Sequence, residues 1–325
     1  MGPELLEVYI EITNKCNLKC IHCLADSNLK ASNELTMSEV LFFLNNISKR
    51  GVERVTFTGG EPFTRNDFLK VIKKTPKGLS IKIMTNGTLL TSEQIRYLKD
   101  LGRDICFQIS IDSNYPQTHD MIRGVNGSFE KTRRNVLELV KEGFPVTVVA
   151  TVMSANISEI SSLNYWCSAN GICFGLNTLG IMGRANKSLC PTKEDYRELI
   201  KNTKCEFLTP IENACGVGFS KISVKPNGDI SPCTNFFGLS LGNIKKDDIF
   251  EVFQNHPIMK EIRRATVDNI RECKKCPAKK RCGGGCRQRA FAMHGRFDAP
   301  DDVMCVLFRK KHKLKLEHPE NFPLR

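Results

Sequence analysis

Residues 8–23 read VYIEITNKCNLKCIHC, and residues 55–62 read VTFTGGEP. Each stretch begins with a short run rich in β-branched and aromatic residues, which is typical of a strand, and then runs into a loop. The first loop carries cysteines at positions 16, 20 and 23, and the second begins with Gly59 and Gly60. The two stretches therefore predict chemistry at the ends of consecutive strands.

Similar strand patterns recur at regular spacing through the first half of the chain. The predicted strands are Val8–Thr13, Val55–Thr58, Ile81–Thr85, Ile105–Ile111, Val146–Val152 and Cys173–Thr178. Helix-start signals lie between them at Thr36 with Glu39, at Thr91 with Gln94, and at Ser128. Six such units predict an α/β fold with a parallel sheet, either open or curled into an incomplete barrel, whose chemistry lies at the C-terminal strand ends.

The alternation stops after about residue 205. Asn227-Gly228 predicts the turn of a hairpin between Ile222–Val224 and Ile230–Ser231. Short helices are expected over Asp248–Phe253 and Ile258–Arg264, followed by a cysteine-rich loop from 273 to 286. We therefore expect a barrel domain over 1–205, a small α+β domain over 206–310 and a basic tail over 311–325.

Composition narrows the class of protein. A chain of 325 residues with 41% hydrophobic residues can bury a full core, which excludes disorder. Neither a signal peptide nor a membrane-spanning run is present in the sequence, so we expect a cytoplasmic protein. In that reducing compartment, 15 cysteines favour metal or cluster ligation over disulfides.

The charge is also uneven. The formal net charge is +13, and residues 201–325 hold 24 Lys and Arg against 14 Asp and Glu. Such an excess favours an acidic partner, although a basic tail is also an ordinary solvated helix end.

The spacing Cys16-x3-Cys20-x2-Cys23 suits an iron–sulfur cluster. Three thiolates on one loop can ligate three irons of a [4Fe-4S] cubane and leave the fourth iron open. Buried or zinc-bound thiols are the alternative for this triplet. In the second loop, two glycines would allow a ligand close to the backbone, and Glu61 would offer a carboxylate to an ammonium group.

Taken together, CxxxCxxC after the first strand and GGEP after the second resemble the radical S-adenosylmethionine (radical SAM) enzymes, over roughly residues 6–185. The resemblance implies a TIM-like partial (β/α)6 barrel in which Cys16, Cys20 and Cys23 hold the cluster that binds SAM. It further implies SAM contacts by His22 at the adenine, by Gly59, Gly60 and Glu61 at the amine, by Thr85, Asn86, Ser110 and Asp112 toward the ribose, and by Arg123 at the carboxylate. Ser-x-Asp is also an ordinary helix-capping arrangement.

The cysteines of the second half resemble the SPASM domain of a subset of radical SAM enzymes, which typically carries two auxiliary [4Fe-4S] clusters. By position, the resemblance assigns Cys273, Cys276, Cys282 and Cys305 to an outer cluster and Cys215, Cys233 and Cys286 to an inner one. Lys221 stands where some members have a further inner ligand. The inner cluster therefore has either an open iron or another ligand such as Cys205. A zinc ribbon is the alternative reading of these cysteines.

The remaining cysteines have less definite roles. Cys106 and Cys173 lie within strand patterns and are expected to be core residues. A hydrogen-atom donor among Cys167, Cys190 and Cys205 stays an open alternative.

The resemblance implies an enzyme that uses SAM and three [4Fe-4S] clusters to generate a 5′-deoxyadenosyl radical. We expect oxidative modification of a peptide or protein, giving a thioether or carbon–carbon crosslink or an oxidised side chain. The expected partners are an acidic peptide precursor, a flavodoxin- or ferredoxin-like reductant and a separate leader-binding protein. One alternative is a small-molecule substrate such as a tetrapyrrole side chain. The other, a zinc- and nucleic-acid-binding protein, would explain the charge but not GGEP.

Overall fold

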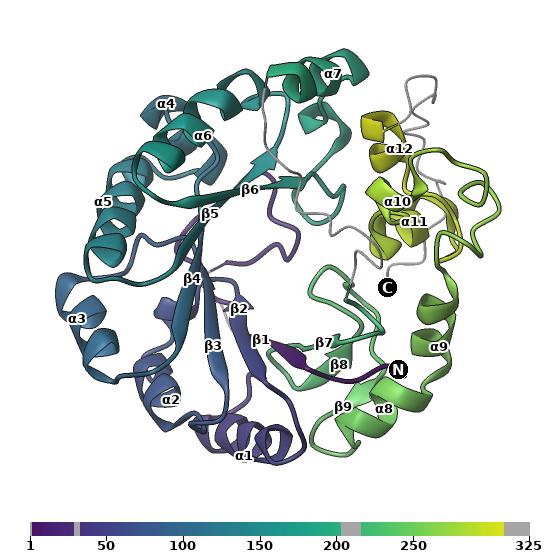
Figure 1. The fold of residues 1–325 in the computed structure, drawn as a ribbon. Helices are drawn as coiled ribbons and strands as arrows, with labels where there is room; N and C mark the ends of the chain where they lie inside the picture. The colour runs from purple at the N-terminus through teal and green to yellow at the C-terminus, as the bar shows by residue number, and fades with distance from the viewer. Residues whose placement is uncertain (1, 29–32, 203–215, 309–325) are drawn as a thin grey trace.

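The computed structural model describes residues 2–28, 33–202 and 216–308. Six parallel strands run through the first half and confirm the predicted strands to within one residue at each end. They are β1 (Glu7–Thr13), β2 (Arg54–Gly59), β3 (Ser80–Thr85), β4 (Ile105–Ser110), β5 (Val146–Val152) and β6 (Cys173–Thr178). The sheet curves with its helices outside, which makes an α/β partial barrel that resembles part of a TIM barrel (Figure 1).

Helices follow the strands in order. They are α1 (Met37–Ser48), α2 (Phe68–Lys74), α3 (Ser92–Asp100), α4 (Pro116–Arg123), α5 (Ser128–Lys141), α6 (Ile160–Ala169) and α7 (Lys193–Asn202), with short 3₁₀ turns at Pro62–Thr64, Ile157–Glu159 and Lys187–Leu189. Both predicted capping boxes form: the Thr36 side chain accepts from the Glu39 backbone N–H, and Thr91 does so from Gln94. Sequence-local capping therefore places the starts of α1 and α3.

The start of α5 differs from the prediction. Gly127 is the N-cap residue, and Ser128 is the first helical residue. The cap comes from the preceding helix, because the Asp120 carboxylate accepts hydrogen bonds from Gly127 N, Ser128 Oγ and Phe129 N. The capping acceptor is thus supplied from α4, by a residue seven positions before Gly127.

The second half of the chain continues the same sheet. Its strands are β7 (Lys221–Val224), β8 (Asp229–Ser231) and β9 (Gly242–Asn243), and its helices are α8 (Ile249–Asn255), α9 (Pro257–Arg264), α10 (Lys279–Cys282), α11 (Arg287–His294) and α12 (Asp302–Phe308). The predicted hairpin is confirmed as β7–β8, with Gly228 at φ +92°. β7 also pairs in parallel with β1, which gives the strand order β6-β5-β4-β3-β2-β1-β7-β8-β9.

Alternation along β1 explains how it joins the two halves. Val8, Ile10 and Ile12 are almost fully buried in the main apolar core. The residues between them face the other side of the sheet. There Glu7 Oε2 lies 3.1 Å from Lys221 Nζ, and Glu11 Oε1 lies 2.6 Å from Lys225 Nζ. Within the described ranges, no helix is both long and apolar enough to cross a bilayer.

Candidate functional site

Three thiols share the loop that follows β1. Cys16 and Cys20 are buried, Cys23 is half-buried, and all three pack with Leu18 in one small cluster. Burial raises the pKa of the Cys16 thiol to about 12, and the neighbouring thiols Cys20 and Cys23 add to the shift. Thiols in such surroundings are stabilised as thiolates only when a positive centre lies among them, as in a metal or cluster site.

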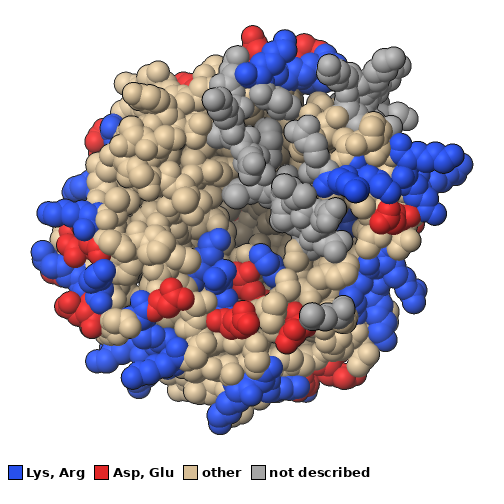
Figure 2. Space-filling model, in the orientation of Figure 1, with Lys and Arg blue, Asp and Glu red and all other residues tan. Residues whose placement is uncertain are grey.

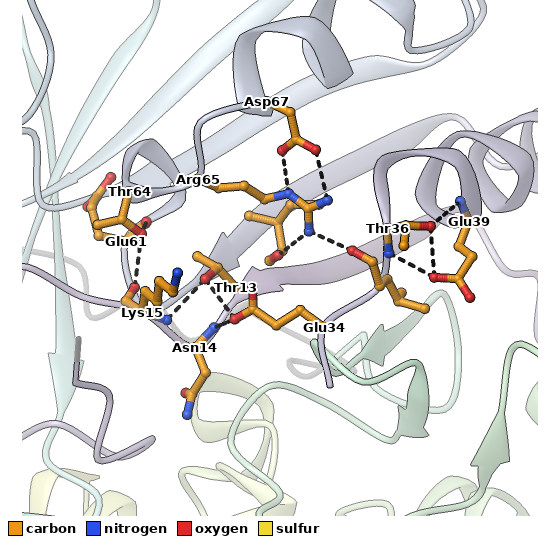
Figure 3. Close-up of polar contacts among 12 residues, drawn as sticks. Thr13, Asn14, Lys15, Glu34, Thr36, Glu39, Glu61, Thr64, Arg65 and Asp67 are labelled. Carbon is orange, nitrogen blue, oxygen red and sulfur yellow. Dashed lines mark hydrogen bonds and ion pairs between the residues drawn. The ribbon is translucent and has the colours of Figure 1, made fainter. Parts of the chain in front are cut away.

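The base of this loop is fixed by polar contacts, which Figure 3 shows. Glu34 Oε1 accepts hydrogen bonds from Thr13 Oγ1 at 2.8 Å and from Asn14 N at 2.7 Å. Arg65 donates from Nη1 to the carbonyl oxygen of Ile12 at 3.0 Å. These contacts set the direction in which the loop leaves the strand.

The two glycines after β2 pack against the base of the same loop. An added Cβ would lie 2.2 Å from Thr13 O at Gly59 and 2.2 Å from Lys15 O at Gly60. Backbone hydrogen bonds join the two segments here, from Gly60 N to Thr13 O and from Glu61 N to Lys15 O. The space at their Cβ positions is filled by the chain's own backbone, and their expected contact with the SAM amine stays a prediction.

The Glu61 side chain is held by hydrogen bonds within the protein. It is fully buried and accepts hydrogen bonds from Thr85 Oγ1, from Asn86 N and from Phe63 N at 2.7, 2.7 and 3.1 Å. Burial raises its pKa to about 6, against the lowering effect of those donors. Asn86 also donates from Nδ2 to Asn17 Oδ1 in the cysteine loop. The carboxylate therefore ties the ends of β2 and β3 together, and its expected contact with the SAM amine stays a prediction.

A buried ion pair lies beside Cys20. Arg123 Nη2 is 2.7 Å from Asp112 Oδ2, and Arg123 Nη1 donates to Cys20 Sγ at 3.7 Å. Thr151 N donates to Asp112 Oδ1 at 2.9 Å. Burial alone would raise the Asp112 pKa, but Arg123 and nearby histidines lower it. Asp112 holds the Arg123 guanidinium, and its expected place toward the ribose of SAM stays a prediction.

Four thiols of the C-terminal half line one small pocket. They are Cys273, Cys276, Cys282 and Cys305, the set assigned above to the outer cluster. Burial raises the pKa of Cys305 to about 12 and that of Cys282 to about 11. Across all described residues, no three His, Cys, Asp or Glu side chains converge on a single ion position.

Comparison with known proteins gives the family. Residues 10–163 match the model of the radical SAM superfamily, and residues 215–277 match that of SPASM, an iron–sulfur cluster-binding domain. The protein is a radical SAM enzyme with a SPASM domain. SAM and [4Fe-4S] clusters are therefore its cofactors, which favours clusters over a zinc ribbon.

Several relatives cover most of the chain. The subtilosin biosynthesis protein AlbA of Bacillus subtilis is 31% identical over 87% of this chain and 67% of its own length. An AdoMet-dependent heme synthase of Methanosarcina barkeri is 28% identical over 91% of this chain and 95% of its own. The solved structure of Streptococcus suis SuiB with its precursor peptide SuiA superposes with a TM-score of 0.75 at 20% identity, covering 93% of this chain and 76% of SuiB, and confirms the fold.

The surroundings of the radical SAM thiols fit a polar cofactor. His22 Nδ1 and Arg123 Nε are buried and have no hydrogen-bond partner among the residues that the structure describes. Buried polar atoms without partners are costly, so a ligand that bonds to them would be favoured. Burial lowers the pKa of His22 to about 4, which keeps the imidazole neutral. Ser110, half-buried at the end of β4, keeps its expected ribose role as a prediction.

The inner thiol set is only partly described. Cys215 and Cys205 lie outside the described residues, so their grouping with Cys233 and Cys286 stays a prediction. Lys221, at the position of the further ligand, pairs with Glu7.

Sequence reasoning missed Asp301, which organises the loop that precedes α11. Its Oδ2 accepts from Cys286 N at 2.7 Å, and the carboxylate also binds Arg289. At Gly285, φ +74°, an added Cβ would lie 2.5 Å from the Asp301 side chain. A lone aspartate gives no sequence signal for such a role, but the Gly283-Gly284-Gly285 run does indicate a tight approach.

Proposed function

We propose that this radical SAM enzyme oxidatively modifies a peptide or protein, forming a thioether or carbon–carbon crosslink or oxidising a side chain. The observation that carries the proposal is the presence in one chain of two separate thiol groups, the CxxxCxxC loop after β1 and the four-thiol pocket of the C-terminal half. AlbA is named for bacteriocin biosynthesis, and SuiB was solved with a precursor peptide, which supports a peptide as the substrate class.

The residues of the barrel rim would hold the cofactor. Cys16, Cys20 and Cys23 would ligate the first cluster, the backbone of residues 59–61 would face the SAM amine, and Arg123 its carboxylate. Asp112 fixes the direction of the Arg123 guanidinium and, with Ser110, would lie toward the ribose. When bound, SAM and its cluster supply a 5′-deoxyadenosyl radical that removes a substrate hydrogen atom, and the auxiliary clusters supply an acceptor for the second electron.

We also propose a count of three clusters. The outer one would use the four pocket thiols, and the inner one Cys215, Cys233 and Cys286. Because Lys221 is engaged by Glu7, the fourth inner position would be an open iron or Cys205. The proposed boundaries are a barrel over 1–205, a SPASM domain over 206–310 and a basic tail over 311–325, although β1 and β7 share one sheet.

Exposed cations beside the four-thiol pocket support acidic partners. Arg271, Lys274, Lys275 and Lys280 are exposed on the segment that carries three of its cysteines. The acidic residues nearby are already engaged, since Asp268 pairs with Lys279 and Glu272 with Arg296. Figure 2 shows Lys and Arg gathered at the right-hand edge, over α9 and the segment that follows it. A flavodoxin- or ferredoxin-like reductant and an acidic precursor, presented by a separate leader-binding protein in the cytoplasm, fit this surface.

The test is anaerobic turnover with SAM, dithionite and candidate precursor peptides. We expect 5′-deoxyadenosine and a peptide that has lost two hydrogens, both abolished by Cys16→Ala. A peptide of unchanged mass with every candidate, together with a modified small molecule, would overturn the peptide proposal.

One observation favours a second candidate. The match to the heme synthase of M. barkeri covers 95% of that protein, whereas the match to AlbA covers 67%. A tetrapyrrole with carboxylate side chains is therefore the small molecule to include, and loss of carbon dioxide from it would identify this activity.

A further inference from the structure

A short segment after β6 lies directly against the radical SAM cysteine loop. Arg184 N donates to Cys23 O at 3.0 Å. An added Cβ at Gly183, whose φ is +59°, would lie 2.4 Å from the carbonyl oxygens of both Cys23 and Leu24. The two segments therefore meet backbone to backbone, at a distance that only glycine permits.

The Arg184 side chain extends this contact along the loop. Its Nε donates to Cys20 O at 2.8 Å, and its Nη1 donates to Ser27 O at 3.0 Å and to Asp26 Oδ1 at 2.9 Å. Asp26 has a φ of +46°, which is sparsely populated by residues other than glycine. One guanidinium thus joins both ends of the stretch 20–27 and stabilises a turn that is costly on its own.

The same segment also reaches the SPASM domain. Met182 Sδ accepts a hydrogen bond from Gln288 Nε2, and Gln288 is buried in α11 only two residues after Cys286. Ala185 packs in a small apolar cluster with Ile21 of the cysteine loop. Residues 180–185 therefore touch the radical SAM loop on one side and the helix that follows an auxiliary-cluster cysteine on the other.

We propose that Arg184 is a positioning residue that sets the geometry of the Cys20–Cys23 turn, and that residues 180–185 link this turn mechanically to α11. The inference rests on the ligand roles of Cys20 and Cys23 in the proposed function. Arg184 presets the loop before any iron binds, because all of its contacts are to the chain itself.

Hydrogen–deuterium exchange on the anaerobic, cluster-free full-length protein tests the proposal independently of activity. In Arg184→Met the amides of residues 20–28 are expected to exchange at least about tenfold faster, because the loop loses three hydrogen bonds. Arg184→Lys keeps the charge and one donor, so it should restore part of the protection.

Arg103→Met is the matched control. The Arg103 guanidinium also bridges backbone carbonyls, those of Thr75, Pro76 and Leu79, far from the cysteine loop in sequence. The Arg103→Met variant should leave hydrogen–deuterium exchange in residues 20–28 unchanged. Equal exchange in Arg184→Met and the wild type, or an equal rise in Arg103→Met, would overturn the positioning role even if the peptide chemistry is correct.

The link to α11 has its own readout. Gln288→Ala is expected to raise exchange in residues 180–185 as well as in α11, and to change the electron paramagnetic resonance spectrum of the reduced, SAM-bound cluster. If exchange rises only in α11 and the spectrum is unchanged, segment 180–185 does not couple α11 to the radical SAM loop.

Discussion

At the scale of the residue, Gly60 has a structural role that the sequence did not indicate. The glycine pair was predicted to lie beside a ligand, which stays a prediction, and the structure adds a close crossing of two backbone segments, with Lys15 O 2.2 Å from the position of a Cβ on Gly60. Long-range contacts of this kind leave no local signature. For the same reason Arg184 was missed: its partners lie more than 150 positions away.

Gly60→Ala should displace the cysteine loop. Because Lys15 O lies 2.2 Å from the new methyl position, the backbone must shift, at a cost of about 1–3 kcal/mol. We expect a clear loss of iron and acid-labile sulfide after reconstitution. Gly78→Ala, whose nearest contact is Ser48 Oγ at 3.5 Å, is the control. Full iron loading of Gly60→Ala would show that cluster binding does not require the close backbone crossing at Gly60.

At the scale of the element, strand and helix patterns predicted most of the fold. Period-two alternation and capping boxes are local, so β1 to β6 and the starts of α1 and α3 could be derived from sequence. The cap of α5 could not, because its acceptor, Asp120, belongs to α4.

Asp120→Ala should destabilise the α4–α5 corner by about 1–2 kcal/mol, since three donors lose their acceptor. Burial would raise the Asp120 pKa, but these hydrogen bonds lower it overall. A lowered carboxyl pKa stabilises the fold above the unfolded value of about 3.9 and loses this effect as the pH falls through the folded value.

Urea unfolding monitored by Trp166, the single tryptophan, measures this difference. The ring is buried in α6, and Arg133 of α5 lies 5.2 Å from it. The difference in the free energy of unfolding between wild type and Asp120→Ala should be largest near neutral pH and shrink below about pH 4. The exposed Asp100→Ala serves as control, and a gap independent of pH would exclude the carboxylate cap.

At the scale of the whole molecule, one sheet contains strands from both of the units that the sequence predicts. Composition and the end of the strand–helix alternation predict two units, but pairing of β7 with β1 is non-local and could not be derived. The resemblance to the SPASM domain assigns Cys273, Cys276, Cys282 and Cys305 to one cluster. In the structure these four thiols line one pocket, and their role as cluster ligands stays a prediction.

Metal content tests the molecule as a unit. Three clusters predict about 12 iron atoms per chain, and changing Cys16, Cys20 and Cys23 together to alanine should leave about 8. The loss of iron from both halves in that variant would mean that the clusters do not assemble independently. Zinc without acid-labile sulfide would contradict the cofactor assignment.

The position of β1 inside the sheet has a consequence for biosynthesis. A ribosome releases β1 well before β7, the strand that covers its second edge, because β7 lies some two hundred residues later in the chain. Throughout that interval the edge of β1 lacks its backbone partner, and Glu7 and Glu11 lack Lys221 and Lys225. Those two carboxylates, charged while unpaired, would discourage the nascent strand from adding to the wrong sheet.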